Sequence, residues 1–298
     1  MKKQQTKIAA GGVSGSTTYF LFTLIPVCLY TFFYAVSVIN GIRYSFTDWD
    51  GLSISYSFVG LKNYRNLLSN RIFWNSIRTT VCYCILLVAC TLTVSLLLAI
   101  SLNSLKAFKT LTKSVFFVPA MIGGVTIALI WDQMYYRVVP LIGQTLGIDW
   151  LSQSVLMTKT TALPAVVFVQ TWQAVAMPTV IFIAGLQQIA EDEYESAMLD
   201  GATPFQKFRY ITMPHLMPTV TVNLVLLIKQ GLTSFDFPYA LTGGGPVRST
   251  QVVGILIYED AFKNMRFSAA NAEACVLFVI VAAFSLTQLR LTRGETNG

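Results

Sequence analysis

The sequence predicts an all-α integral membrane protein with about six transmembrane helices. Hydrophobic residues make up 54% of the 298-residue chain, and only 12% of its residues are charged. An ordinary soluble domain carries roughly 25% charged residues, so this chain lacks the charge to cover a water-exposed surface. Long stretches almost free of charge alternate with short polar segments, and a helix needs about 20 mainly apolar residues to cross a bilayer.

The spans form one expected transmembrane domain, residues 19–292, between an N-terminal tail at 1–18 and a C-terminal tail at 293–298. Lys2, Lys3 and Lys7 precede the first apolar stretch, as in a signal peptide. That stretch is long enough to span, and no small-residue cleavage site follows a short apolar core, so we expect an uncleaved helix. We place the six spans at about residues 19–42, 79–104, 114–135, 160–188, 211–238 and 268–290.

The net charge of +7 does not indicate nucleic-acid binding. Basic residues are spread over short connecting segments and form no stripe interleaved with aromatic residues, so we expect contact with membrane lipid and no nucleic acid. All five cysteines lie in apolar stretches, where a free cysteine behaves as a small hydrophobe. Their spacing matches neither a disulfide framework nor a zinc signature.

The distribution of positive charge leaves the orientation open. With the N-terminus in the cytoplasm, ten basic residues fall on each side of the membrane, so the positive-inside rule does not decide by count. The N-terminal and 106–113 clusters are the densest and contain no acids, which favours a cytoplasmic N-terminus. Residues 43–78, 132–159 and 239–266 are then expected to form exterior loops.

The long hydrophilic segment between the fourth and fifth expected spans has the local chemistry of two short helices. Asp192 can cap the first, with Glu195 three residues later as its capping-box partner. Gly201 suits the left-handed position after a helix. Thr203 can cap the second helix, with Pro204 in its first turn and Gln206 completing a second capping box. Apolar residues on these helices need burial, either against the chain's own spans or against a partner.

The run at 195–202, with Phe208, Ile211, Pro214 and Pro218 after it, resembles the EAA loop of binding-protein-dependent ABC importer permeases. The segments SFTDWDG and FVGLKNY within 45–64, FFVPA at 116–120, FDFPYALTGGGP at 235–246 and IYEDAF at 257–262 resemble the carbohydrate-importer branch, of the maltose and glycerol-3-phosphate permease type. The resemblance extends from Tyr19 to Arg290. Ser196 departs from it, since the family usually has alanine there.

The resemblance implies a type I ABC importer permease fold, in which the loop at 191–213 is a cytoplasmic coupling helix that docks into a groove on an ATPase. Both chain termini would then be cytoplasmic, in a bacterial cytoplasmic (inner) membrane. The implied partners are a second, homologous permease subunit as a heterodimer, two cytoplasmic ATPase subunits and an extracytoplasmic solute-binding protein. The residues expected at the ATPase contact are Tyr194, Glu195, Ser196, Ala197, Met198, Asp200, Gly201, Ala202 and Phe205.

No catalytic residues and no metal are expected on this chain. It has neither a P-loop nor a G-x-G-x-x-G motif, so the resemblance assigns ATP and Mg to the partner ATPase. A membrane-embedded enzyme lacks support, because no metal-ligand constellation and no pair of nucleophile and base is apparent in the sequence.

Polar groups within the spans are candidates for a solute path, because ionisable residues inside a membrane are costly and usually functional. Lys229 and Asp236 are seven residues apart and would share one face of a fifth helix. The resemblance implies that spans four to six line the path. For any one residue, a hydrogen bond between helices, or a salt bridge from Lys229 to Asp236 or Glu273, is the plainer explanation. The candidates are Gln170, Gln173, Asn223, Lys229, Gln230, Asp236 and Glu273.

The leading functional hypothesis is a permease subunit that imports a carbohydrate or related solute by alternating access. Lys229 suggests that an anionic solute is possible, and a neutral oligosaccharide is equally open. The alternative is an ion-coupled secondary transporter that uses Lys229, Asp236 and Glu273. Such transporters usually contain internal inverted repeats, and no duplication is visible in this sequence.

Overall fold

The computed structural model describes residues 15–104 and 117–295, which are predominantly helical. Within these ranges, the pairing of extended backbone is limited to one isolated antiparallel bridge between Thr47 and Phe58. Four helices are long and apolar enough to cross a membrane, over Phe22–Tyr44, Arg71–Asn103, Pro204–Leu232 and Phe267–Gln288. Two further helices, α8 (Lys159–Ala174) and α9 (Ala176–Leu186), meet at an angle of 51° and form a fifth span if they cross the membrane together.

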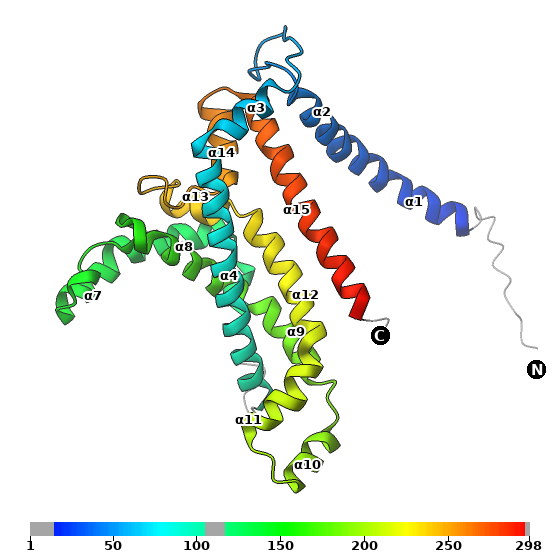
Figure 1. Cartoon of the computed structure of the whole chain (residues 1–298), viewed down its shortest axis with the longest axis vertical. Helices are drawn as coiled ribbons and strands as arrows, with labels where there is room; N and C mark the ends of the chain where they lie inside the picture. The colour runs from blue at the N-terminus through cyan, green and yellow to red at the C-terminus, as the bar shows by residue number, and fades with distance from the viewer. Residues whose placement is uncertain (1–14, 105–116, 296–298) are drawn as a thin grey trace, which may run out of the picture.

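The first of these helices leans away from the rest of the molecule (Figure 1). α1 (Gly15–Tyr30), a π-helical turn (Thr31–Ala35) and α2 (Val36–Tyr44) form one continuous helix. No residue in its most apolar window is buried within the chain, and α2 contacts α15 (Phe267–Glu295). So large an apolar surface belongs against lipid or another membrane subunit.

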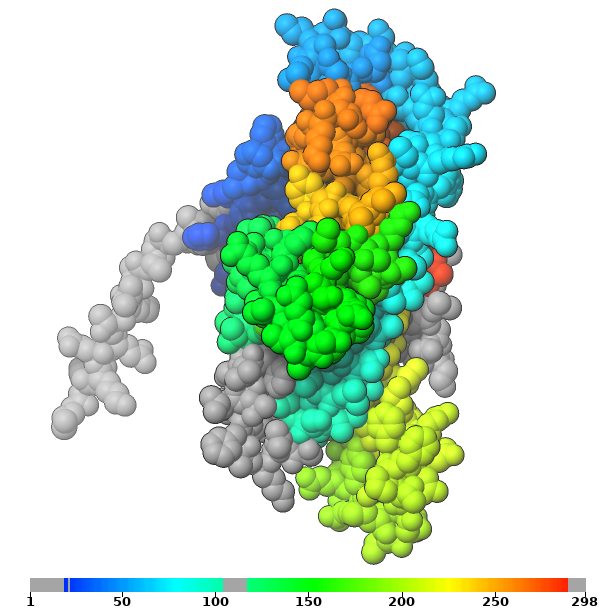
Figure 2. All heavy atoms as spheres, turned by 90° about the vertical axis from the view of Figure 1, so that its left-hand side faces the viewer, coloured from blue at the N-terminus to red at the C-terminus, as the bar shows by residue number. Residues whose placement is uncertain are grey.

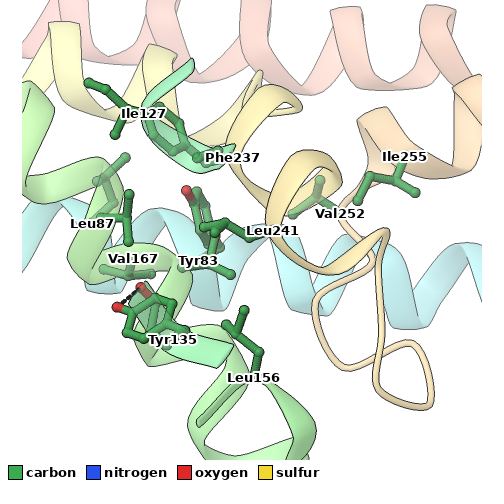
Figure 3. Packing of buried hydrophobic residues seen from close by; sticks show 14 residues of the cluster. Tyr83, Leu87, Ile127, Tyr135, Leu156, Val167, Phe237, Leu241, Val252 and Ile255 are labelled. Atoms are coloured by element: carbon green, nitrogen blue, oxygen red, sulfur yellow. Dashed lines mark hydrogen bonds between the residues drawn. The ribbon is translucent and has the colours of Figure 1, made fainter. Parts of the chain in front are cut away.

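The long helix α4 (Arg71–Ser104) forms the centre of the bundle and packs against α8, α9 and α12 (Met213–Leu232). Tyr83 of α4 is fully buried in a cluster that includes Leu87, Val167 of α8 and Leu241 of α13 (Asp236–Thr242), as Figure 3 shows. In a membrane, close packing of this kind, rather than removal from water, holds helices together.

The third predicted span, 114–135, is not a single helix. Residues 105–116 lie outside the described part of the chain, and the helix that follows stops at residue 121. After Ile122 and Gly123 the chain resumes as α6 (Gly124–Gln133). The Ile122 carbonyl accepts a hydrogen bond from Gln173 Nε2 at 2.9 Å, so a side chain satisfies a backbone group that the break releases.

The predicted exterior loop at 132–159 is largely helical. A π-helical turn (Met134–Val138) continues α6 into α7 (Val139–Leu146). Gly147 ends α7 in a left-handed conformation, with φ of 66°, so it is a helix terminator. Gly143 lies inside α7, where an added Cβ would be only 2.4 Å from the Leu151 carbonyl carbon, so it permits close packing of the backbone.

The fifth and sixth apolar helices have different limits from those predicted. α11 (Pro204–Lys207), a π-helical turn (Phe208–Thr212) and α12 form one helix of 29 residues that ends at Leu232. The chain breaks at Thr233–Phe235 before α13 begins. Asp236 is therefore on another helix, and the prediction that it shares a helix face with Lys229 was wrong. α15 begins one residue before the predicted sixth span.

The two ends of the molecule differ in structure. Figure 1 shows α10 (Glu191–Leu199) and α11 at one end, and α3 (Lys62–Ser69) with the loop before it at the other. α14 (Val253–Tyr258) and a π-helical turn (Glu259–Lys263) lie near that second end. Between the ends, the segment that contains α6 and α7 projects from the body, towards the viewer in Figure 2.

Candidate functional site

The first turn of α10 is not capped as predicted. The helix begins at Glu191, its N-cap is Ala190, and no side chain caps it. Asp192 therefore lies within the first turn and cannot form the expected capping box with Glu195. Glu191, Asp192 and Glu193 all lie in that turn, where carboxylates are favoured by the positive end of the helix dipole.

The turn after α10 is as predicted. Gly201 has φ of 76°, and its N–H donates to the Met198 carbonyl at 3.1 Å. The Ala202 N–H donates to the Ala197 carbonyl at 2.9 Å. These two bonds form a Schellman motif, which turns the chain sharply.

The start of α11 is also as predicted. Thr203 forms a capping box with Gln206, and Pro204 occupies the first turn. The helix that it starts is not a separate short one, however, because it continues into α12 without interruption.

One face of α10 is held against the chain itself. The Tyr194 hydroxyl lies 2.8 Å from Thr212 Oγ1, and the Tyr194 ring packs against a cluster that contains Phe182 and Leu216. On the same side, His215 Nε2 lies 3.4 Å from Glu193 Oε1. Tyr194 therefore anchors α10 to the bundle, and it is not part of the surface that α10 presents outward.

The residues around the turn after α10 expose apolar groups, and no residue of α10 is buried within the chain. We call Met198, Leu199, Phe205 and Tyr210 the apolar tip; all four are exposed, and Leu199 is 91% exposed. Leu199 and Tyr210 were not predicted as part of this surface. A shallow groove lies beside the tip, lined by Ala197, Asp200, Gly201, Ala202, Gln206, Lys207, Tyr210 and Ile211.

Four of the predicted path residues line one cavity of about 300 Å³. Gln170 and Gln173 come from α8, Gln230 from α12 and Asp236 from the start of α13. We call this the inner cavity; its remaining lining is Gly124, Thr233, Ser234, Phe235 and Phe237. Helices that are distant in sequence thus bring amides, hydroxyls, one carboxyl and two aromatic rings together.

Hydrogen bonds fix part of this lining. Gln170 is buried, and its Oε1 accepts from the Tyr83 hydroxyl and from Ser234 Oγ, the latter at 3.1 Å. Gln173 is fixed by its bond to the Ile122 carbonyl. Tyr83 is a supporting residue that sequence reasoning missed, because its position on α4 does not indicate which helix it faces.

The other three predicted path residues lie elsewhere. Asn223 is buried and donates from Nδ2 to the Pro178 carbonyl at 3.3 Å, so it joins α12 to α9. Lys229 is exposed, and within residues 15–104 and 117–295 it forms no ion pair with Asp236 or Glu273. Glu273 lines a different pocket near the start of α15. None of the three lines the inner cavity.

Residues 91–294, more than half of the chain, match the family described as binding-protein-dependent transport system inner membrane component. The chain belongs to this family. This inner membrane component is 37% identical over 272 residues to the multiple sugar-binding transport system permease protein MsmF of Streptococcus mutans serotype c, with 91% of this chain and 94% of that protein covered. It is 33% identical over 273 residues to the probable starch degradation products transport system permease protein AmyD of Thermoanaerobacterium thermosulfurigenes, with 92% and 91% covered.

The fold of this inner membrane component is also similar to that of a chain in the crystal structure of a bacterial ABC transporter that imports the acidic polysaccharide alginate. The TM-score is 0.78 at 20% identity, over 93% of this chain and 96% of that chain. The predictions of an ABC importer permease and of an all-α type I permease fold are therefore confirmed. None of these comparisons supports the ion-coupled alternative.

Proposed function

We propose that this permease subunit imports a neutral carbohydrate, driven by a separate ATPase that docks on the apolar tip. The observation that carries the carbohydrate assignment is the lining of the inner cavity. Amide and hydroxyl groups suit a solute rich in hydroxyls, and Phe235 and Phe237 add apolar lining. The name of the relative MsmF, a multiple sugar-binding system, supports the same class.

The lining argues against an anionic solute. Within the described part of the chain, the inner cavity contains no lysine or arginine, and its one charged group is the Asp236 carboxyl. Burying an anion beside a carboxylate without a compensating cation is unfavourable. Lys229, which suggested an anionic solute, is not in the lining, so a neutral saccharide is the better match.

The apolar tip supports a docking role because α10 and α11, which carry most of it, lie at the end of the molecule opposite α3 and the loop before it (Figure 1). An exposed leucine and two exposed aromatic rings around a sharp turn fit a helix-in-groove contact. We infer that ATP binding by the partner moves α10 and that α12, to which α10 is anchored, carries the movement to the inner cavity.

The proposed assembly contains this chain, a second homologous permease, two ATPase subunits and an external solute-binding protein. ATP and Mg bind to the ATPase subunits. The apolar tip and both chain termini face the cytoplasm, and the membrane is a bacterial cytoplasmic membrane. In this arrangement, the loops beside α3 and α14 face outward.

Uptake by the complete transporter, reconstituted with these partners in proteoliposomes, tests the function. Radiolabelled maltose, maltotriose and trehalose serve as neutral probes, and glycerol 3-phosphate serves as an anionic one. We expect ATP-dependent uptake of at least one neutral saccharide and none of the anion. Uptake that needs an ion gradient and no ATP would contradict the proposal.

Gln230→Leu should weaken saccharide binding in the inner cavity. The variant removes the amide of a half-buried residue, and a lost hydrogen bond is worth about 0.5–1.5 kcal/mol. We expect the KM for the transported saccharide to rise about two- to tenfold at unchanged protein level. Val225→Leu, on the exposed side of the same helix, is the control, and an unchanged KM for Gln230→Leu would remove this residue from the path.

Gly201→Val should reduce uptake about tenfold, because a residue other than glycine in the left-handed region costs about 1–2 kcal/mol. An added Cβ at Gly201 meets nothing within 4 Å, so the chain's own packing does not oppose the change. Gly201→Asn is the matched variant, since asparagine tolerates this conformation, and it should keep most of the uptake. Equal loss in both variants would show that size, and not backbone conformation, matters there.

A further inference from the structure

The outer end of the molecule contains a second polar pocket, of about 340 Å³. We call it the outer pocket; it lies between α3, the loop before α3 and the start of α15. Its lining includes Trp49, Asn66, Asn70, Asp260, Arg266 and Glu273. Amides, charged groups and an indole ring thus converge on a space large enough for a sugar ring.

Glu273 provides an independent sign that the outer pocket takes a ligand. Its side chain is 1% exposed and lines the pocket, and within residues 15–104 and 117–295 its Oε2 has no hydrogen-bond partner. A buried acceptor without a partner is unfavourable and uncommon. The neighbouring Asp260 already accepts from Arg266 and Asn264. The Glu273 carboxyl also faces Asp260. Its Oε2 is therefore the buried polar atom that a hydroxyl group of a ligand would satisfy.

One carboxylate of the outer pocket, Asp50, is occupied by its own loop. Asp50 accepts from Ser53 Oγ at 2.7 Å and from the Ser53 and Leu52 N–H groups. The side-chain bond and the backbone bonds lower the pKa of Asp50 to about 2, so this carboxylate is ionised and serves to order the loop. It leaves Asn66, the remaining N–H groups of Arg266 and the Glu273 carboxyl for ligand contacts.

A row of aromatic rings connects the outer pocket with the inner cavity. Trp49 lines the outer pocket and lies 5.8 Å from Phe267 between ring centroids. Phe262 follows at 5.5 Å from Phe267, and Tyr258 lies 5.3 Å from Phe262. Phe235 lies 5.5 Å from Tyr258 and lines the inner cavity. We call these five residues the aromatic row.

The surroundings of the row indicate water or a polar partner, and not lipid. Phe262 is 62% exposed, yet Glu259, Lys263 and Arg266 lie within four residues of it and bear charge. Lys263 is paired with Glu259 at 3.3 Å. Charged groups at this density are unfavourable in hydrocarbon, so the exposed ring of Phe262 faces an aqueous space.

We propose that the outer pocket is a saccharide-binding subsite and that the aromatic row guides the saccharide from it to the inner cavity. This inference rests on the proposed function, and it adds a site and a route to it. Sugar rings have apolar faces that pack on aromatic rings, while their hydroxyls can bond to Asn66, Arg266 and Glu273. Along the aromatic row, a sugar ring could move from one aromatic side chain to the next while it still contacts at least one of them.

The test uses the reconstituted transporter and the neutral saccharide that the uptake assay identifies among maltose, maltotriose and trehalose. Phe262→Leu removes the ring and keeps an apolar side chain at an exposed position, so folding is preserved. Asn66→Ala removes one exposed amide from the outer pocket. Phe262→Tyr keeps an aromatic face, and Phe278→Leu, an exposed ring on α15 outside the row, is the matched control.

We expect Phe262→Leu and Asn66→Ala to raise the KM for the saccharide about three- to tenfold, with Phe262→Tyr and Phe278→Leu close to wild type. Saturation-transfer NMR without the solute-binding protein should detect the same saccharide on the wild-type complex and less of it on Phe262→Leu. If Phe262→Leu and Asn66→Ala both take up the saccharide at the rate of the wild type and with an unchanged KM, the inference is overturned and the proposed function still stands. A second outcome would also overturn it: the variants change only the concentration of solute-binding protein that half-saturates transport. The outer pocket and the aromatic row would then contact the solute-binding protein and not the saccharide.

Discussion

Leu199→Asp will abolish ATP-driven saccharide uptake while the chain remains folded and inserted. Leu199 is 91% exposed at the apolar tip, so the carboxylate meets water in the isolated chain. Docked in an apolar groove, the same carboxylate would be buried without a partner, which costs about 3–5 kcal/mol. We therefore expect uptake to fall about 100-fold or more, measured as the initial rate in proteoliposomes.

Leu199→Met is the matched control, since it keeps an apolar side chain of similar volume and should retain most of the activity. The amount of each variant in the membrane and its thermal midpoint should equal those of the wild type. Normal uptake by Leu199→Asp would contradict the docking role of the tip.

The second large effect concerns folding, and it arises where α12 crosses α4. Gly231 is buried, and an added Cβ would lie 2.9 Å from the Cys84 Cα and 2.8 Å from its Sγ. The added Cβ would collide with the backbone of Cys84 as well as its side chain, so a change of rotamer cannot relieve the clash. Small residues at such crossings let membrane helices approach closely. Gly231→Leu should lower stability by about 1–3 kcal/mol or more.

We expect Gly231→Leu to reduce the yield of monodisperse protein in detergent and to lower the thermal midpoint by several degrees. Val225→Leu adds volume at an exposed position of the same helix and should behave like the wild type. An unchanged midpoint for Gly231→Leu would mean that the two helices are not packed as closely as described.

Local sequence chemistry predicted the turn beside the apolar tip well. The positive φ of Gly201 and the Thr203–Gln206 capping box depend on residues within a few positions of one another, so the sequence around them is sufficient. The start of α10 was predicted less well, because Asp192 and its two acidic neighbours offer several capping registers and the chain uses none of them.

The inner cavity shows where sequence spacing becomes insufficient. Lys229 and Asp236 share a face only if the helix continues, and it stops at Leu232. Gln170 and Gln230 line one cavity because α8 and α12 both pack on α4, which no local pattern encodes. The same limit explains why Glu273 was grouped with the path, although it lies in the outer pocket.

The most direct test of the proposed coupling is to identify the protein that contacts the apolar tip. A photoreactive benzoylphenylalanine placed at position 199 of the complete transporter should crosslink to the ATPase on irradiation. The same group at position 262 should not. Crosslinking from position 199 to the external solute-binding protein, or to no protein while transport remains normal, would contradict the proposed coupling and orientation.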